Sequence, residues 1–576
     1  MSEQDREPPE RPVQRPAQPP QPPQPPKPPP APQKPTRPAR PARPSAVLDE
    51  AHLGDIQGAF GRIPRDRVET ARPGLKARLL TLLAIVGPGI IVMVGDNDAG
   101  GVATYAQAGQ NHGYSLLWVL LLLIPVLIVN QEMVVRLGAV TGVGHARLII
   151  ERFGRFWGWF SVGDLFLLNF LTLVTEFIGI SLAAGYLGVS RYVVVPVAAL
   201  VLIGVAASGS FRRWERAMFV FIAASLLLVP LTLMSHPQWG RAAHDFVVPG
   251  IQGGASGEAV LLIIAMVGTT VAPWQLFFQQ SNVIDKRITP RFIGYERADT
   301  VIGSLVVVAG GAALIMIADY AARGTGAHGH FTDAAGVAEA LGRHDPVLGV
   351  LFAVVLLDAS IIGAAAVTLA TSYAFGDVFN LRHSLHRRFR EARKFYASYS
   401  LLVLVAAAIV LIPGAPLGLI TEGVQALAGL LLPSASVFLL LLCNDPEVLG
   451  PWVNRRRLNA LAALIIAVLL MLSGMLMVTT LFPAVDVTAL TLWFSIALAG
   501  CLTAAAALRI ARRRAPPRPV PVLPRAEKLA WRMPPLALLR PVRWSPGTRL
   551  GMTALRAYLI LGALLLLVKV IRLGGA

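Results

Sequence analysis

The stretch "VGDNDAGG", residues 94–101, interrupts an apolar run that otherwise resembles a membrane helix. The run extends from residue 79 to residue 109 and holds two carboxylates, one amide and three glycines at this point. A carboxylate at the centre of a membrane helix costs about 2.5–3.5 kcal/mol, and each glycine costs about 1 kcal/mol relative to alanine. Unwound backbone at membrane depth occurs where it lines a cavity or is buried in protein. The stretch therefore predicts a functional break in a membrane span.

The composition of the whole chain is that of a polytopic membrane protein. Of its 576 residues 54% are hydrophobic and 15% are charged, and the mean hydropathy is +0.59. Soluble domains carry more charge, and apolar stretches long enough to cross about 30 Å of hydrocarbon recur along the chain. We identify thirteen such stretches, at residues 78–109, 115–136, 160–186, 192–207, 217–234, 259–281, 300–320, 347–375, 396–412, 418–443, 459–481, 487–509 and 553–573.

The formal net charge of +19 does not indicate nucleic-acid binding, because the basic residues follow the membrane pattern. Nineteen Lys and Arg residues lie in five alternate loops, and only four Arg residues lie in the loops between them. The positive-inside rule then places the N-terminus in the cytoplasm. The lipid bilayer is the expected partner, and an integral protein of a bacterial cytoplasmic membrane is the expected location.

Changes in composition divide the chain into five parts. We expect a disordered, Pro- and Arg-rich cytoplasmic segment at 1–75, a ten-helix transport core at 76–445 and helices 11 and 12 at 446–512. A basic, Pro-rich cytoplasmic linker at 513–550 then leads to an extra membrane helix at 551–576. The first segment has no apolar core of the kind that a signal peptide requires.

Motifs for other chemistries are missing from the sequence. Cys443 and Cys501 both lie in apolar stretches, so neither a disulfide framework nor a cysteine-rich metal motif is expected. No phosphate-binding loop of the G-x-x-x-x-G-K-[ST] kind occurs. We therefore expect neither an enzyme nor a bound cofactor.

A second stretch, "AMVGTTVAPWQLFFQQS" at residues 265–281, is also interrupted. Pro273 stands near its middle, where proline costs about 3 kcal/mol or more in a regular helix. The two interrupted stretches are the first and the sixth, so five helices separate their starts. This spacing is typical of five-plus-five inverted repeats, in which the substrate site lies at the bilayer midplane between the two breaks.

These motifs resemble those of the NRAMP divalent-metal transporters. In that family the first helix carries GPG, eight further residues and then DPGN-x-A-T, which here begins at Gly87 and places the family aspartate at Asp98. The sixth-helix pattern G-x-x-V-M-P-H-N-L appears here as "GTTVAPWQL". Further matches are "LGAVTG" at 137–142, "TEFIG" at 175–179 and Gln425, eight residues before Pro433.

The resemblance spans about residues 80–510 and implies an all-α polytopic protein with the LeuT-like 5+5 inverted-repeat fold. Helices 1 and 6 would be unwound, and additional C-terminal helices would follow. It also implies metal-ion transport by alternating access. The implied metal site comprises Asp98, Gly95, Gly101, Thr269, Ala272, Gln275 and Gln425. Accessory positions are Asp96, Asn97, Trp274 and Glu176.

One departure from the family bears on the choice of metal. The family methionine, whose soft sulfur favours transition metals, is Ala272 here. A carboxylate, amide oxygens and backbone carbonyls suit a partly hydrated hard cation such as Mg²⁺, and Mn²⁺ accepts the same ligands. The pattern resembles the NRAMP-related magnesium transporters, a branch that lacks the methionine. Asp96 either adds charge at the mouth of the site or caps the broken half-helix.

A second departure concerns protons. The family aspartate three residues before Glu176 is Leu173 here, and the sixth-helix histidine is Trp274. A proton route needs titrating groups in a hydrogen-bonded chain, so we expect transport without proton coupling. A proton-coupled Mn²⁺/Fe²⁺ transporter is the first alternative. A membrane sensor built on a transporter fold is the second. The sequence leaves the oligomeric state open and is compatible with a monomer.

Overall fold

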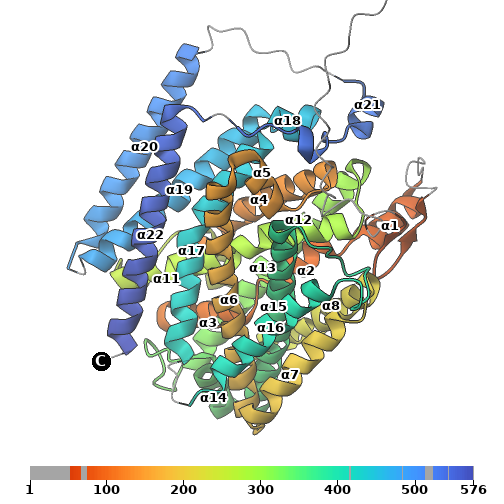
Figure 1. Ribbon diagram of the computed structural model, residues 1–576. Coiled ribbons are helices and arrows are strands. Elements are labelled where there is room, and N and C mark those ends of the chain that lie inside the picture. The colour runs from red at the N-terminus through yellow and green to blue at the C-terminus, as the bar shows by residue number, and fades with distance from the viewer. Residues whose placement is uncertain are drawn as a thin grey trace, which may run out of the picture. The chain divides into compact units, whose positions relative to one another are not determined.

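The computed structural model describes residues 52, 54–65, 74–413, 417–482, 484–512, 523–542 and 544–574 (Figure 1). The Pro- and Arg-rich segment up to residue 51 and the first part of the linker, 513–522, lie outside the described residues.

The described residues form helices and one small antiparallel hairpin, β1 (Ile56–Gln57) and β2 (Arg62–Ile63). The helices are α1 (Leu75–Ile85), α2 (Pro88–Val94), α3 (Ala99–His112), α4 (Leu117–Thr141), α5 (His145–Phe153), α6 (Arg155–Tyr186), α7 (Arg191–Ala206), α8 (Phe211–Ala224), α9 (Leu228–Met234), α10 (Trp239–Val247), α11 (Gly257–Thr270), α12 (Pro273–Asp285), α13 (Ile293–Ala322), α14 (Ala334–His344), α15 (Pro346–Phe379), α16 (Arg393–Val410), α17 (Leu417–Cys443), α18 (Pro446–Leu449), α19 (Arg456–Leu481), α20 (Val487–Arg512), α21 (Arg525–Ala530) and α22 (Pro546–Gly574).

The helices confirm a polytopic membrane fold. Among the described residues eleven helices are long and apolar enough to cross a membrane, or twelve if the bent pair α1 and α2 counts as one span. Each of the thirteen apolar stretches coincides with one helix or with consecutive helices. The spans from α1 to α9 and from α11 to α17 are the two halves of the LeuT-like fold, and α19, α20 and α22 are the additional C-terminal helices.

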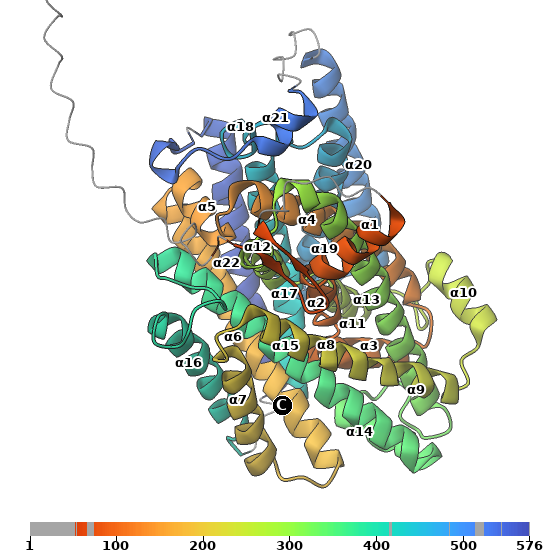
Figure 2. The same ribbon diagram turned by 90° about the vertical axis from the view of Figure 1, so that its right-hand side faces the viewer.

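One part of the expected disordered N-terminus is ordered. Residues 54–65 fold into the β1–β2 hairpin, in which Ile56 pairs with Ile63 and both side chains are buried. The hairpin packs against α1, and Figure 2 shows it beside that helix. The expectation of disorder over all of 1–75 was wrong here, because a short hairpin next to a helix buries apolar side chains that the local composition does not reveal.

Both predicted breaks are present, and proline begins a half-helix at each. The first span bends by 52° between α1 and α2 and is interrupted again at residues 95–98. The sixth is interrupted at residues 271–272, so Pro273 is the first residue of α12. Its missing N–H costs nothing there, since the first N–H groups of a helix have no helical partner in any case. Pro88 has the same place in α2.

Glycines let α11 and α17 approach closely, and this contact places the tenth span against the sixth-span break. A Cβ at Gly268 of α11 would overlap the Gln425 carbonyl and the Gly429 amide of α17. Close helix contacts through small residues are usual in membranes.

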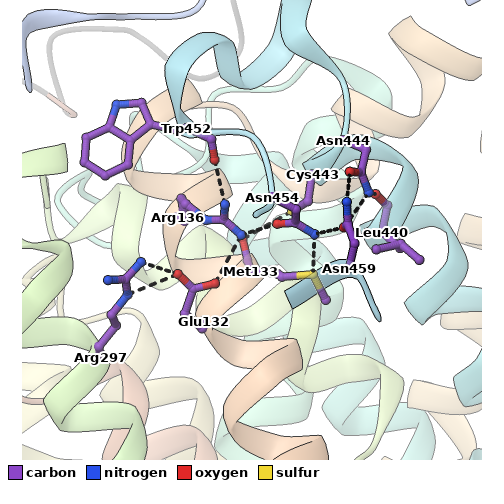
Figure 3. Close-up of polar contacts among 10 residues, drawn as sticks. All are labelled: Glu132, Met133, Arg136, Arg297, Leu440, Cys443, Asn444, Trp452, Asn454 and Asn459. Atoms are coloured by element: carbon purple, nitrogen blue, oxygen red, sulfur yellow. Dashed lines mark hydrogen bonds and ion pairs between the residues drawn. The ribbon is translucent and has the colours of Figure 1, made fainter. Parts of the chain in front are cut away.

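A polar network joins α4, α13 and the segment between α17 and α19 (Figure 3). Arg136 forms an ion pair of 3.1 Å with Glu132 and donates to the Trp452 carbonyl at 2.6 Å and to Asn454. Arg297 of α13 pairs with the other Glu132 oxygen. Glu132 and Arg136 of α4 therefore form an ion pair that links three elements.

We expect the substitution Gly268→Ala to destabilise the protein by about 1–3 kcal/mol, because the added methyl group meets backbone that side-chain movement cannot clear. Thermal unfolding of the purified protein measures this effect. Gly163→Ala on α6 is the matched control, because nothing lies within 4 Å of a Cβ at that position. An equal or smaller loss for Gly268→Ala than for the control would contradict the close contact.

Candidate metal-ion site

Asp98 lies in the gap of the first span and begins α3. It is the N-cap residue, and its Oδ1 accepts the Gly101 N–H at 2.7 Å. A carboxylate is favourable at this position because it satisfies a free N–H and faces the positive end of the helix dipole. The side chain is 3% exposed. Since Asp98 is the cap, the alternative in which Asp96 caps the half-helix is wrong.

Thr269 and Gln425 converge on the same point as Asp98. A Cβ at Gly101 would lie 3.3 Å from Thr269 Oγ1 and 3.5 Å from Asp98 Oδ1. A Cβ at Gly100 would overlap the Gln425 side-chain amide and would lie 3.3 Å from Asp98 Oδ1. The two glycines thus leave the space in which polar groups of α11 and α17 face the carboxylate.

Glu176 of α6 reaches the same break from the other side. Its Oε2 accepts the Ala99 N–H at 3.1 Å, and the carboxyl group is fully buried. Gly363 of α15 makes room for both acids, because a Cβ there would lie 2.7 Å from Asp98 Cβ and from Glu176 Oε2. Two buried carboxyl groups therefore sit against one glycine of the eighth span.

Asp96 belongs to a second polar group, made with Gln275 and Gln131. Gln275 Nε2 donates to Asp96 Oδ1, and Gln131 Nε2 of α4 donates to Gln275 Oε1 at 3.0 Å. All three side chains are fully buried. Gln275 was expected to direct its amide oxygen at the metal beside Asp98. In the structure that oxygen accepts from Gln131 and the NH₂ group faces Asp96.

The remaining predicted positions have distinct surroundings. Asn97 Nδ2 donates to the Val307 carbonyl at 3.3 Å, so its side chain is held on α13. Trp274 packs against Phe278, with ring centroids 5.9 Å apart. Ala272 is the N-cap residue of α12 and contributes only a methyl group to the break.

Two backbone carbonyls lose their helical partners at the breaks. The residue four positions after Thr269 is Pro273, which has no N–H. The residue four positions after Gly95 is Ala99, whose N–H is donated to Glu176 instead. Both carbonyls were expected to face the metal, and both are free of the bond that a continuous helix would give them.

Several buried polar atoms around the two breaks have no hydrogen-bond partner, which is costly in a protein interior unless a ligand or water supplies one. They are Asp96 Oδ2, Asn97 Oδ1, Gln131 Oε1, Glu176 Oε1, Thr269 Oγ1, Trp274 Nε1 and Gln425 Nε2. Within the described ranges, no set of three or more His, Cys, Asp or Glu side chains is arranged to hold a metal ion. The donors at the breaks are therefore a few carboxylates together with amides, a hydroxyl and the backbone.

A narrow cavity, with about 20 Å³ of space for water-sized molecules, approaches the site from the side of the molecule on which α14 lies. It begins at Ala99 and Thr104 of α3 and reaches Asp333 and Ala334 at the start of α14. In Figure 1, α14 lies at the bottom, α5 and α18 lie toward the top, and α1 lies at the right between them. The cavity thus lies toward the α14 end of the molecule, away from α5 and α18.

Comparison with known proteins agrees with this arrangement. The model of the family described as natural resistance-associated macrophage protein-like (Nramp) matches residues 89–479. The chain belongs to the Nramp family. A divalent metal cation transporter MntH of Ralstonia nicotianae is 30% identical over 406 residues, which are 67% of this chain and 89% of that protein.

A second relative and one solved structure are also similar to this chain. A divalent metal cation transporter MntH 1 of Pseudomonas aeruginosa is 30% identical over 408 residues, 68% of this chain and 90% of that protein. A solved manganese transporter of Eremococcus coleocola, in complex with an aromatic bis-isothiourea substituted compound, superposes with a TM-score of 0.58 at 21% identity. That match covers 77% of this chain and 96% of the other, and it shows a shared fold.

Two residues at the Nramp site were missed by the sequence analysis. Gln131 stands next to Asn130 in the apolar stretch of α4, and this polar pair at membrane depth was a usable signal. Gly363 gave no signal, because its role depends on α15 lying against α3 and α6.

We expect Gln131→Leu to lower stability by about 1–3 kcal/mol, because Gln275 Oε1 is left buried without a donor. Thermal unfolding in metal-free buffer measures this. The neighbouring Asn130→Leu is the control, since Asn130 Nδ2 makes no hydrogen bond. If the two variants melt alike, Gln131 does not hold Gln275 in place.

Proposed function

We propose that the chain moves a hard divalent cation, Mg²⁺ and also Mn²⁺, into the cytoplasm by alternating access. The observation that carries the proposal is the Asp98 carboxylate in the gap between two broken spans. Asp96, Asp98 and Glu176 are all buried, and among the described residues no Lys or Arg is a charge partner of any of them. Buried carboxylates without a cation are very costly, so a positively charged ligand fits this gap.

The donor set favours a hard cation. Thr269 offers a hydroxyl and Gln425 an amide beside Asp98, and the freed carbonyls of Gly95 and Thr269 offer backbone oxygens. Mg²⁺ binds oxygen and keeps several waters, and Mn²⁺ accepts the same ligands. Ala272 supplies no sulfur and leaves room for retained water.

Asp96 adds a second carboxylate to the gap. Its Oδ2 has no partner, and its Oδ1 accepts from Gln275. For Gln275 to coordinate through its oxygen, its amide must leave Gln131 and turn. In the state described here Asp96 therefore provides charge, and Asp98 and Thr269 provide the first coordinating atoms. Gln425, whose Nε2 faces Gly100, coordinates through its oxygen only after its amide turns.

We expect Asp98→Asn to abolish Mg²⁺ and Mn²⁺ binding, because it removes the capping carboxylate at the centre of the donor set. Ala272→Met should shift preference toward Mn²⁺ and softer ions, because it adds a thioether. Calorimetric competition of Mg²⁺, Mn²⁺ and Ca²⁺ on the purified protein measures both effects. Unchanged binding in Asp98→Asn, or unchanged selectivity in Ala272→Met, would refute the assigned role of that residue.

Transport without proton coupling is the second part of the proposal. Leu173 is buried in α6 where the family has a titrating residue, and Trp274 lies in an aromatic contact with Phe278. An inside-negative potential of 100 mV favours entry of a divalent ion by about 4.6 kcal/mol, so the membrane potential alone is a sufficient driving force.

In proteoliposomes with an internal pH reporter, we expect metal uptake driven by a K⁺ diffusion potential without acidification of the lumen. The uptake rate should also be independent of an imposed pH gradient. Lumenal acidification in proportion to metal entry would instead establish the proton-coupled alternative.

The same proposal includes the orientation of the protein in the membrane and the division of the chain into segments. The basic loops support a cytoplasmic N-terminus and a cytoplasmic hairpin side. Residues 76–445 form the transport core, with helices 11 and 12 at 446–512, a cytoplasmic linker at 513–550 and an extra helix at 551–576. The bacterial relatives favour the cytoplasmic membrane as the location, and a monomer suffices for the site because one chain supplies all of its donors.

The relatives support the alternative in which Mn²⁺ is the substrate. Their names, a divalent metal cation transporter and a manganese transporter, favour Mn²⁺ as a substrate. The competition and proteoliposome experiments separate this from Mg²⁺ transport. Binding without any flux would favour the sensor alternative.

A further inference from the structure

The joint between α1 and α2 is clamped by buried charges from three other elements. Lys286, which follows α12, donates through Nζ to the Ile85 carbonyl at 2.7 Å, the Val86 carbonyl at 2.9 Å and Glu215 Oε1 of α8 at 2.6 Å. Asp299 of α13 accepts the N–H groups of Gly87 at 3.1 Å and of Gly89 at 2.7 Å. The clamp therefore fixes the half of the first span that lies on the hairpin side.

The N-terminal hairpin is fastened onto this clamp. The Ala59 N–H donates to the second Glu215 oxygen at 2.5 Å, and Arg216 Nε donates to the Ala59 carbonyl at 3.2 Å. Gly58 lies against α1, because a Cβ there would overlap the Ala84 carbonyl. Phe60 packs on Phe219 of α8 with ring centroids 4.5 Å apart.

A second anchor lies at the end of α12. Arg287 donates to the Asp55 carbonyl at 3.0 Å, and His52 Nε2 lies 3.9 Å from Asp285 Oδ1. His52 lines a small cavity, with about 10 Å³ of space for water-sized molecules, together with Asp285 and with His383 of the segment that follows α15. Residues 52 and 54–65 therefore contact α1, α8, the end of α12 and the segment after α15.

We propose that residues 52 and 54–65 form a strap that holds the first broken span closed on the hairpin side. Opening of a transporter of this fold requires one part of the bundle to rock against the other. The strap ties α1 and the end of α12, which belong to the two broken spans, to α8 and the segment after α15. The cavity next to Asp98 lies along α3, on the other side of the break from α1, as closure at the strap requires.

The strap lies outside the part of the chain that the family model matches. The matched residues begin at 89, after α1, and residues 52 and 54–65 therefore lie before the matched part of the chain. The inference rests on the proposed function only for its link to transport, because the contacts themselves are structural.

Hydrogen–deuterium exchange of the full chain in lipid nanodiscs tests the strap. Gly58→Val drives the strap off Ala84, and its added side chain also comes to about 3.3 Å from Lys286 Nζ. Ala59→Pro deletes the N–H that Glu215 accepts. In both variants we expect the amides of residues 84–94, at the clamped joint and in α2, to exchange about tenfold faster. Gly163→Val is the matched control, because a Cβ at Gly163 meets nothing within 4 Å.

Unchanged exchange at residues 84–94 in both variants would overturn the strap, even if the hairpin itself exchanged faster. Metal flux into proteoliposomes separates this result from failure of the proposed function. Faster exchange at 84–94 in a protein that carries no divalent cation would refute the transport proposal and leave the strap intact. Cation flux with unchanged exchange at residues 84–94 would refute the strap and leave the transport proposal intact.

Discussion

A helix that stops inside a membrane leaves peptide N–H and C=O groups without helical partners, and no lipid group can replace them. In this chain acids take the N–H groups at the first break: Asp98 accepts from Gly101, and Glu176 accepts from Ala99. Pro273 removes the corresponding N–H at the second break. Glu176 keeps Oε1 free, and this oxygen, with Asp96 Oδ2 and the orphaned carbonyls, forms the negative gap that suits a cation.

The two ends of the first broken span have different surroundings. Toward α14 a cavity reaches α3, whereas on the hairpin side Lys286 and Asp299 hold the α1–α2 joint through buried hydrogen bonds. Buried charge pairs are weak contributors to stability but define geometry well, since removing one partner leaves an uncompensated charge. The clamp and the proposed strap therefore define one closed side, which is the asymmetry that alternating access requires.

The sequence placed the spans, both breaks and Asp98 correctly, because membrane hydropathy and glycine or proline at span centres are local signals. It assigned Gln275 to the metal, whereas the structure pairs Gln275 with Asp96 and Gln131. A glutamine carries a donor and an acceptor on one amide, so its orientation depends on neighbours that only helix packing supplies. The direction of the Asn97 side chain also depends on such neighbours, and in the structure its Nδ2 donates to the Val307 carbonyl.

The sequence alone thus determined that this is a membrane protein of two broken-helix repeats with a carboxylate at the first break. Those features depend on residues that are close together in the chain. The free-energy cost of each such residue at membrane depth can be estimated separately from its type. The tertiary structure decided which acid caps α3, which amides face it and how the N-terminal hairpin meets Glu215. Each of these contacts joins residues from separate helices, and their pairing follows from the fit of whole elements.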